Sequence, residues 1–362
     1  MRIVAYFCTI VILAALFTGC GRKQSKKSPV ATWSLFSGVD YPEVPEERVV
    51  RLNKSDFATG KIRSIEQIPL DMMIENRELR MYMKGDYFLF KHLEMRKGAQ
   101  LLHVVSVPDY KVVAKLCPFG EGPDEFLDIR VIPTEETDKL CYIRNLNKDQ
   151  LFYLSTSLEL VECGKLRGIS DFHLVAGENV YLGNNTMLVE LGAGDGMGVC
   201  AVNQKDSTAR GIVPFHFAEG ANWFFYIGEL AHSFLKKRGA FAFTYHDRLA
   251  FFDFDGKNIK MVRFGNQTLK TTSSPENPIY YYDCFASDKY VYAVYRESVN
   301  DRDRRNPYYL EQYDWDGNPV ARYQLPEERG LYTGCATDND SVIYFIDYYE
   351  DNFLHKVVLE KD

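Results

Sequence analysis

Two stretches of the chain decide its fold. Residues 249–262 read LAFFDFDGKNIKMV, and residues 309–323 read YLEQYDWDGNPVARY. In each stretch an apolar, aromatic-rich run leads to Asp-Gly, and a second apolar run follows. Glycine accepts the positive φ angle that a tight turn requires, so this pattern predicts a β-hairpin.

Less regular copies of this hairpin occur earlier in the chain, starting near residues 101, 150 and 199. Successive hairpins are therefore about 50 residues apart, a period typical of propeller blades with four strands each. The inner strand pairs are clearest at residues 80–83 with 87–90 and 280–285 with 290–295. Only residues 230–238 suggest a short helical turn.

The chain ends predict how the ring closes. Beyond residue 325 only three strands follow, at residues 331–336, 341–348 and 353–359. The missing fourth strand is expected from residues 48–70, where residues 49–52 and 62–70 both resemble strands. We therefore predict an all-β, six-bladed β-propeller with four-stranded antiparallel blades, its last blade closed by an N-terminal strand that removes a free edge.

The N-terminus predicts export. A basic start and an apolar run over residues 3–17 are typical of a signal peptide, and the run ends at Gly19-Cys20. Small residues before a cysteine at this depth resemble the bacterial lipobox, which implies lipidation of Cys20. We predict a signal peptide (residues 1–19), a lipid-anchored flexible tether (20–44) and the propeller (45–362). An ordinary secretory signal or an uncleaved anchor is the alternative.

Composition narrows the function. Lys and Arg number 43 against 50 Asp and Glu, and no basic cluster follows the tether, which argues against nucleic-acid binding. Six cysteines follow Cys20 without a CxxC pair, and we expect buried free thiols with no bond between Cys117 and Cys163. No paired histidines, HExxH, GxSxG or SxxK motif occurs, so we expect no metal and no cofactor.

A few residues stand out as site candidates. Trp223, Phe224 and Tyr226 belong to an aromatic run that would suit ligand contact if exposed, although packing between blades also explains it. Arg296 and Arg302 belong to a charged insertion, which is either a solvated loop or the rim of a binding face. By position alone, the residues expected to point into the channel are His173, His246 and Asp283.

A family resemblance rests on three short motifs. The sequence FGEGPDEF at residues 119–126 resembles the Gly-x-Gly-Pro-x-Glu-Phe/Tyr stretch of the TolB-like six-bladed propeller lipoproteins of bacteria. Residues 65–70 and 313–318 resemble further segments of that family in the same order. The resemblance covers about residues 45–360 and implies a fold and an exported location without assigned chemistry. We read residues 120–123 as a loop between blades, not as a phosphate site.

These observations favour a binding or scaffold module for protein, peptide or glycan in the cell envelope. The alternatives are a channel-sited enzyme, such as a lactonase- or lyase-like hydrolase, and a purely structural envelope component. In the lineage where the resembled family is common, an acidic run after the lipidated cysteine marks surface export. Residues 22–27 are basic here, so we expect a lipid anchor in the outer membrane with the propeller facing the periplasm.

Overall fold

The structure, a computed structural model, is nearly all β. It describes residues 48–72, 80–91, 95–148, 150–165, 179–193, 196–203, 205, 208–215, 226–264, 278–298, 307–326, 331–337, 340–347 and 352–360. Within these residues the only helical element is a 3-10 turn, η2 (Lys54–Asp56). No helix in this part is long and apolar enough to cross a membrane. The predicted signal peptide (residues 1–19) and the whole predicted tether (20–44), including Cys20, lie outside it.

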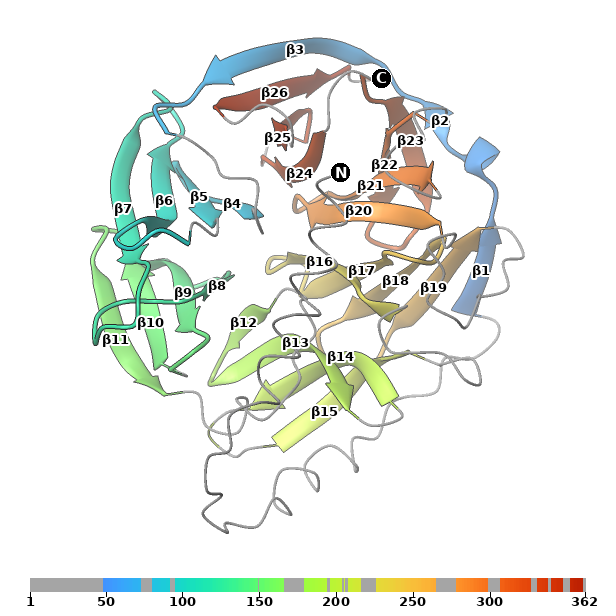
Figure 1. The fold of residues 1–362 in the computed structure, drawn as a ribbon. Helices are drawn as coiled ribbons and strands as arrows, with labels where there is room; N and C mark the ends of the chain where they lie inside the picture. Colours follow the sequence, from blue (N-terminus) through green and yellow to red (C-terminus); the bar gives the residue numbers. More distant parts are fainter. Residues whose placement is uncertain are drawn as a thin grey trace. The chain divides into compact units, whose positions relative to one another are not determined.

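The strands form six blades around a ring (Figure 1), as the sequence predicts. From the channel outwards, blade one contains β4 (Arg80–Lys84), β5 (Tyr87–Lys91), β6 (Gln100–Ser106) and β7 (Val112–Pro118), and blade two contains β8 (Ile129–Ile132), β9 (Lys139–Asn145), β10 (Gln150–Ser155) and β11 (Leu160–Lys165). Blade three contains β12 (Val180–Gly183), β13 (Thr186–Ala193), β14 (Gly196–Asn203) and β15 (Thr208–Phe215).

The second half of the ring repeats this order. Blade four contains β16 (Gly228–Ser233), β17 (Arg238–Phe243), β18 (Arg248–Asp253) and β19 (Ile259–Phe264). Blade five contains β20 (Ile279–Ala286), β21 (Tyr290–Ser298), β22 (Tyr309–Asp314) and β23 (Pro319–Gln324). Blade six contains β24 (Leu331–Ala336), β25 (Val342–Asp347), β26 (Phe353–Leu359) and, outermost, β3 (Ile62–Pro69).

The Asp-Gly turns have the predicted geometry. Gly256 and Gly317 both have φ of +71°. A Cβ on Gly317 would also lie 2.7 Å from the Phe251 side chain of blade four. Only glycine satisfies both conditions at this position.

The prediction of a helical turn at residues 230–238 is wrong. These residues form the end of β16, a tight turn and the start of β17, and His232 pairs with Gly239 across the hairpin. Leu230 and Ala231 are both buried, each in a different interface between blades. A strand with both faces covered shows no clear alternation, so a short window of this kind resembles a helix.

The N-terminal segment follows the outer edges of three blades (Figure 1). We call residues 48–69 the strap. Within it, β1 (Val49–Leu52) pairs in parallel with β19, and β2 (Ala58–Thr59) pairs in parallel with β23. The strand β3 pairs antiparallel with β26, with Ile65 opposite Val357, which confirms the predicted closure. The second candidate strand, β1, adds a fifth strand to blade four.

A lysine of the strap reaches between blades four and five. The Lys54 Nζ lies 2.9 Å from the Asp247 carboxylate and 3.0 Å from the Glu311 carboxylate. It also lies 3.6 Å from the ring centres of Phe264 and Tyr295. Both carboxylates are buried, so an ion pair at this place depends on good geometry and multiple contacts.

Buried apolar clusters between neighbouring blades form the core of the ring. All six cysteines of the described part are free thiols, as expected. Five of them are buried in these clusters, but Cys163 is exposed, which corrects the expectation of burial for that residue. It lies on β11, the outer edge strand of blade two, where only one side of the strand is paired.

The FGEGPDEF segment is a structural loop. The Glu125 carboxylate folds back to accept a hydrogen bond from the Gly122 N–H at 2.7 Å. The Lys148 ammonium donates to the carbonyls of Gly122, Pro123 and Glu125. A side chain on Gly120 would clash with Glu125. The segment is therefore an internally bonded connection between blades one and two, as the sequence predicts.

Candidate functional site

Charged side chains from five blades meet near one end of the central channel. Arg80 begins β4, Arg130 and Glu229 are the second residues of β8 and β16, and Asp283 lies on β20. Glu190 lies on β13, two residues beyond Leu188, which pairs with Val180 at the start of the inner strand β12. Because β13 is antiparallel to β12, Glu190 lies toward the same rim. We call these five residues the channel cluster. Inner strands of a propeller line the channel, so their side chains converge there.

An ion pair crosses the ring at this level. The Arg80 Nη2 lies 2.7 Å from Glu229 Oε1, and the two side chains are 29% and 13% exposed. Their strands, β4 and β16, belong to blades on opposite sides of the ring (Figure 1). Burial raises the pKa of Glu229, and the Arg80 guanidinium opposes this rise. The pair therefore joins opposite blades without fully offsetting the desolvation of the carboxylate.

Asp283 links blade five to blade six. Its carboxylate accepts hydrogen bonds from the Cys284 N–H at 2.9 Å and the Gly334 N–H at 2.7 Å. Burial, and next the charge of Glu229, raise the pKa of Asp283 to about 7, although Arg80 and the two amides oppose the rise. The protonation state of this carboxyl group therefore changes near neutral pH.

Glu190 differs from its neighbours because neither of its carboxyl oxygens has a hydrogen bond. Glu190 is 1% exposed, so the whole residue is buried. Burial raises its pKa well above the usual 4.5, the charge of Glu229 raises it further, and Arg130 lowers it. Glu229 Oε2 is also buried without a hydrogen bond. Buried polar atoms are nearly always paired, so three such oxygens in one cluster require an explanation.

The sequence-predicted candidates are only partly within this cluster. Asp283 belongs to it. His246 lies between β17 and β18, where its ring centre is 4.9 Å from that of Tyr226 and 5.7 Å from that of Phe243. Tyr226 is 1% exposed, within the core between blades three and four. Arg296 on β21 is buried and donates to the Tyr308 hydroxyl at 2.8 Å.

The other predicted residues, His173, Trp223, Phe224, Arg302 and Cys20, lie outside the described residues. Sequence reasoning missed Arg80, Arg130, Glu190 and Glu229. The sequence does contain a pattern that could have identified these residues, because each is a charged residue inside a short apolar strand. Aligning the blade repeats would have brought three of them to the start of an inner strand.

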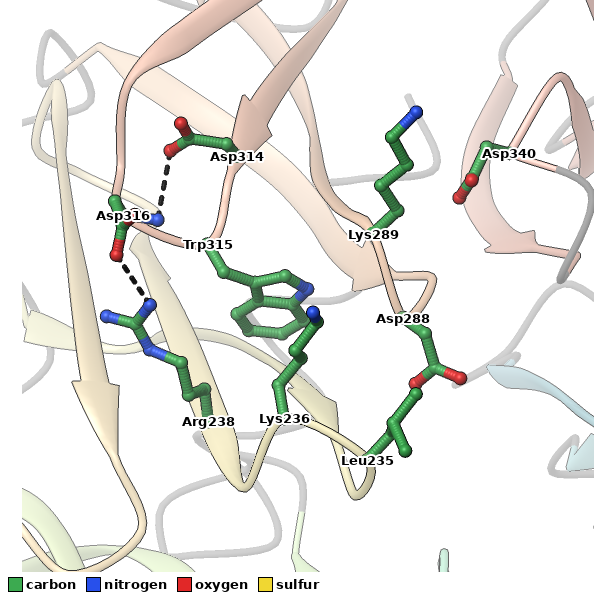
Figure 2. A pocket seen from close by; sticks show the side chains of 9 residues that line it. All are labelled: Leu235, Lys236, Arg238, Asp288, Lys289, Asp314, Trp315, Asp316 and Asp340. Carbon is green, nitrogen blue, oxygen red and sulfur yellow. Dashed lines mark hydrogen bonds and ion pairs between the residues drawn. The ribbon is translucent and has the colours of Figure 1, made fainter.

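A pocket lies at the opposite rim, beside the turns that follow β16, β20, β22 and β24 (Figure 2). It has a volume of about 480 Å³. Its lining residues are Leu235, Lys236, Arg238, Asp288, Lys289, Asp314, Trp315, Asp316 and Asp340.

The acidic groups of this pocket already have structural partners. Arg238 pairs with Asp316 at 2.7 Å (Figure 2). The Ser233 hydroxyl donates to Asp288 at 2.7 Å, which ties blade four to blade five. Asp314 accepts hydrogen bonds from amides of its own hairpin turn, which accounts for the calcium-like spacing of that segment. The pocket is thus lined mainly by residues that stabilise the blades.

Within the described ranges, no group of three or more His, Cys, Asp or Glu side chains could hold a metal ion. The carboxyl groups of the channel cluster therefore do not form a metal centre by themselves.

Comparison with known proteins extends only to the fold. No family model and no curated protein sequence matches the chain. A member of the DUF4221 family from Bacteroides vulgatus ATCC 8482 has a TM-score of 0.60 at 9% identity, covering 85% of this chain and 99% of that one. A protein of Bacteroides fragilis NCTC 9343, whose name suggests export, has a TM-score of 0.57 at 9% identity, covering 86% and 100%.

A virginiamycin B lyase from Staphylococcus aureus has a TM-score of only 0.42 at 8% identity, covering 82% of this chain and 99% of that one. A likeness at that level has no bearing on chemistry. Membership of the TolB-like family is not confirmed by these comparisons. What they establish is that this chain shares its propeller fold with a DUF4221 family protein of Bacteroides.

Proposed function

We propose that the chain is an exported, lipid-anchored binding module of the bacterial cell envelope that holds its ligand at the channel cluster. The observation that carries this proposal is Glu190, a buried carboxyl group without any hydrogen bond. Leaving such a group unpaired costs about 1–3 kcal/mol. A ligand that donates hydrogen bonds to Glu190 would offset this cost on binding.

A purely structural component gives no reason for the unpaired carboxyl group. The structural roles in the cluster already belong to other residues, because Arg80 pairs with Glu229 and Asp283 binds two amides. Functional sites often keep locally unfavourable groups that a ligand satisfies. Glu190 fits that description.

One observation favours a channel-sited enzyme as the second candidate. The pKa of Asp283 is raised to about 7 by burial and by the charge of Glu229, and this value suits a group that gives and takes protons near neutral pH. Its two backbone hydrogen bonds argue for a positioning role instead. We therefore rank binding first and lyase- or lactonase-like chemistry second.

The envelope location is proposed from the N-terminus. The apolar run and Gly19-Cys20 resemble a lipoprotein signal, and the basic residues 22–27 favour the periplasmic face of the outer membrane. The name of the Bacteroides fragilis neighbour, which suggests export, agrees with this location. Protein, peptide or glycan is the expected partner, and the net charge of −7 argues against nucleic acid.

The test compares what co-purifies with two forms of the full chain. Wild type and Glu190→Met are extracted from membranes in mild detergent, and native mass spectrometry records the bound species. We expect a species on the wild type that the variant lacks. Identical spectra, or no bound species on either protein after incubation with envelope extract, would contradict the proposal. Chemical conversion of the bound species by the wild type would favour the enzyme.

A further inference from the structure

We infer that the ligand presents a primary ammonium group, which binds between Glu190 of blade three and Glu229 of blade four. This inference rests on the function proposed above and names the chemistry that the channel cluster would recognise. An amino terminus or lysine side chain of a peptide and the amino group of an amino sugar share that chemistry.

The number and type of unpaired atoms support an ammonium group. Both oxygens of Glu190 and Oε2 of Glu229 are buried acceptors without a donor. An ammonium group carries three N–H donors and no acceptor, so it matches these three oxygens once its positive charge has favoured the ionised form of Glu190, whose pKa is raised by burial and by Glu229. A neutral hydroxyl or amide group supplies fewer donors, and it brings no positive charge to offset the negative charge of two neighbouring carboxyl groups.

The charges around these oxygens exclude other ligand classes. An anionic group would add negative charge beside two carboxyl groups that already repel each other, as the effect of Glu229 on the pKa of Glu190 shows. A guanidinium already occupies Oε1 of Glu229, because Arg80 pairs with it at 2.7 Å. A compact ammonium needs less room beside Arg80 than a second planar guanidinium.

The chain itself contains a filled site of the same kind. Between blades four and five, the Lys54 ammonium lies 2.9 Å from Asp247 and 3.0 Å from Glu311, which are buried carboxylates of neighbouring blades. Glu190 and Glu229 are likewise buried or half-buried carboxyl groups of neighbouring blades. They differ in their cationic neighbours, which among the described residues are the guanidinium groups of Arg80 and Arg130 and not an ammonium group.

The other strong candidate is the pocket beside Trp315. The Nε1–H of Trp315 is buried without a hydrogen bond. The four carboxylates that line the pocket, however, already have hydrogen bonds or ion pairs with other residues of the protein. The pocket also lies wide open between turns (Figure 2), without a buried charge that awaits a ligand. The channel cluster is therefore the stronger site for a ligand.

The experiment uses matched probes with and without the ammonium group. Calorimetric titration of the full chain compares triglycine with N-acetyl-triglycine, and glucosamine with N-acetylglucosamine. We expect at least one free amine to bind, and its acetylated form to bind about tenfold more weakly or not at all. A difference within the triglycine pair would indicate a peptide ligand, and a difference within the glucosamine pair would indicate an amino sugar.

Two variants assign the binding to the cluster. Glu190→Gln should weaken binding of the amine by about tenfold or more, whereas Glu121→Gln, which changes an exposed carboxylate on a loop, should leave it unchanged. Equal binding of free and acetylated probes, no binding of either amine at millimolar concentration, or full affinity in Glu190→Gln would overturn the inference. Glu190-dependent binding of Ca²⁺ or Mg²⁺ with no response to amines would also overturn it.

These outcomes separate the inference from the proposed function. If the amines fail while an envelope species still depends on Glu190, the ammonium chemistry is wrong and the binding module stands. If no species depends on Glu190 in either experiment, both are wrong.

Discussion

Replacing Glu190 with methionine should stabilise the folded protein. Methionine has an unbranched side chain of the same length, so it fills the space without leaving buried acceptors unpaired. Removing an unsatisfied buried polar group gains about 1–3 kcal/mol, and we expect the free energy of unfolding at neutral pH to rise by that amount. Most substitutions at buried positions destabilise a protein, so a gain here would be specific to the unpaired carboxyl group.

The gain should grow with pH. The pKa of Glu190 is raised by burial and by Glu229, so the folded state holds a proton that the unfolded state has lost. Below about pH 4.5, the pKa of Glu190 in the unfolded chain, the carboxyl group is protonated in both states, so its titration does not lower the free energy of unfolding. Above it, wild-type stability falls by about 1.4 kcal/mol per pH unit until the pH reaches the raised pKa. The difference between wild type and Glu190→Met should widen over that same window.

Urea unfolding followed by circular dichroism measures this difference at several pH values. Glu121→Met, at an exposed position, is the matched control and should change stability by less than about 0.5 kcal/mol. A Glu190→Met protein that is less stable than wild type at neutral pH would refute the reasoning, because it would mean that Glu190 has a stabilising partner. A difference that does not depend on pH would show that its pKa is not raised.

Four further predictions concern the strap and the membrane anchor. Lys54→Met should lower the free energy of unfolding by about 3 kcal/mol, measured in urea. This is the lower end of the range for a broken buried ion pair, because Lys54 is partly exposed and Arg322 still pairs with Glu311. An unchanged midpoint would show that the ion pair is unimportant. A chain that starts at Asp71 lacks β3 and leaves the edge of β26 unpaired, so it should aggregate in size-exclusion chromatography; a well-folded, soluble monomer would argue against the closure. Cys20→Ala should move the protein from the membrane to the soluble fraction or block its maturation, and unchanged membrane fractionation would count against lipid anchoring. Protease added to intact cells should leave the wild-type protein intact, because the propeller is expected to face the periplasm; digestion would place it on the cell surface.

Local signals made most of the fold predictable. The Asp-Gly turns at Gly256 and Gly317 define hairpins on their own, and the period of about 50 residues then locates the degenerate copies. Closure by an N-terminal strand followed from counting strands, since a ring with three strands in its last blade leaves an edge unpaired, and residues 62–69 were one of two candidates for that strand. These features depend on residues that are close in sequence or on a simple count.

Long-range pairing and side-chain convergence were not predictable. The parallel pairing of β1 with β19 joins residues that are far apart in sequence, and nothing in residues 49–52 identifies blade four as the partner. Tyr226 was read as a possible contact residue because an aromatic run does not reveal which of its faces is covered. It packs in the core instead.

The channel cluster was missed for the same physical reason. Glu190 and Glu229 belong to different blades, and only the closed ring brings them near Arg130 and Arg80. In the sequence each is a single charged residue in an apolar strand, which could equally face solvent. The lack of hydrogen bonds at Glu190 and at Glu229 Oε2 can be recognised only when every neighbour is placed.

We propose that a ligand binds at the channel cluster and pairs with Glu190. An experimental structure of the full chain with the species that co-purifies from the envelope tests this proposal. We predict ligand density in the channel, with a donor atom within hydrogen-bond distance of Glu190 and of Glu229 Oε2. Density at the pocket beside Trp315, or a bound ligand that leaves Glu190 without a donor, would contradict the account.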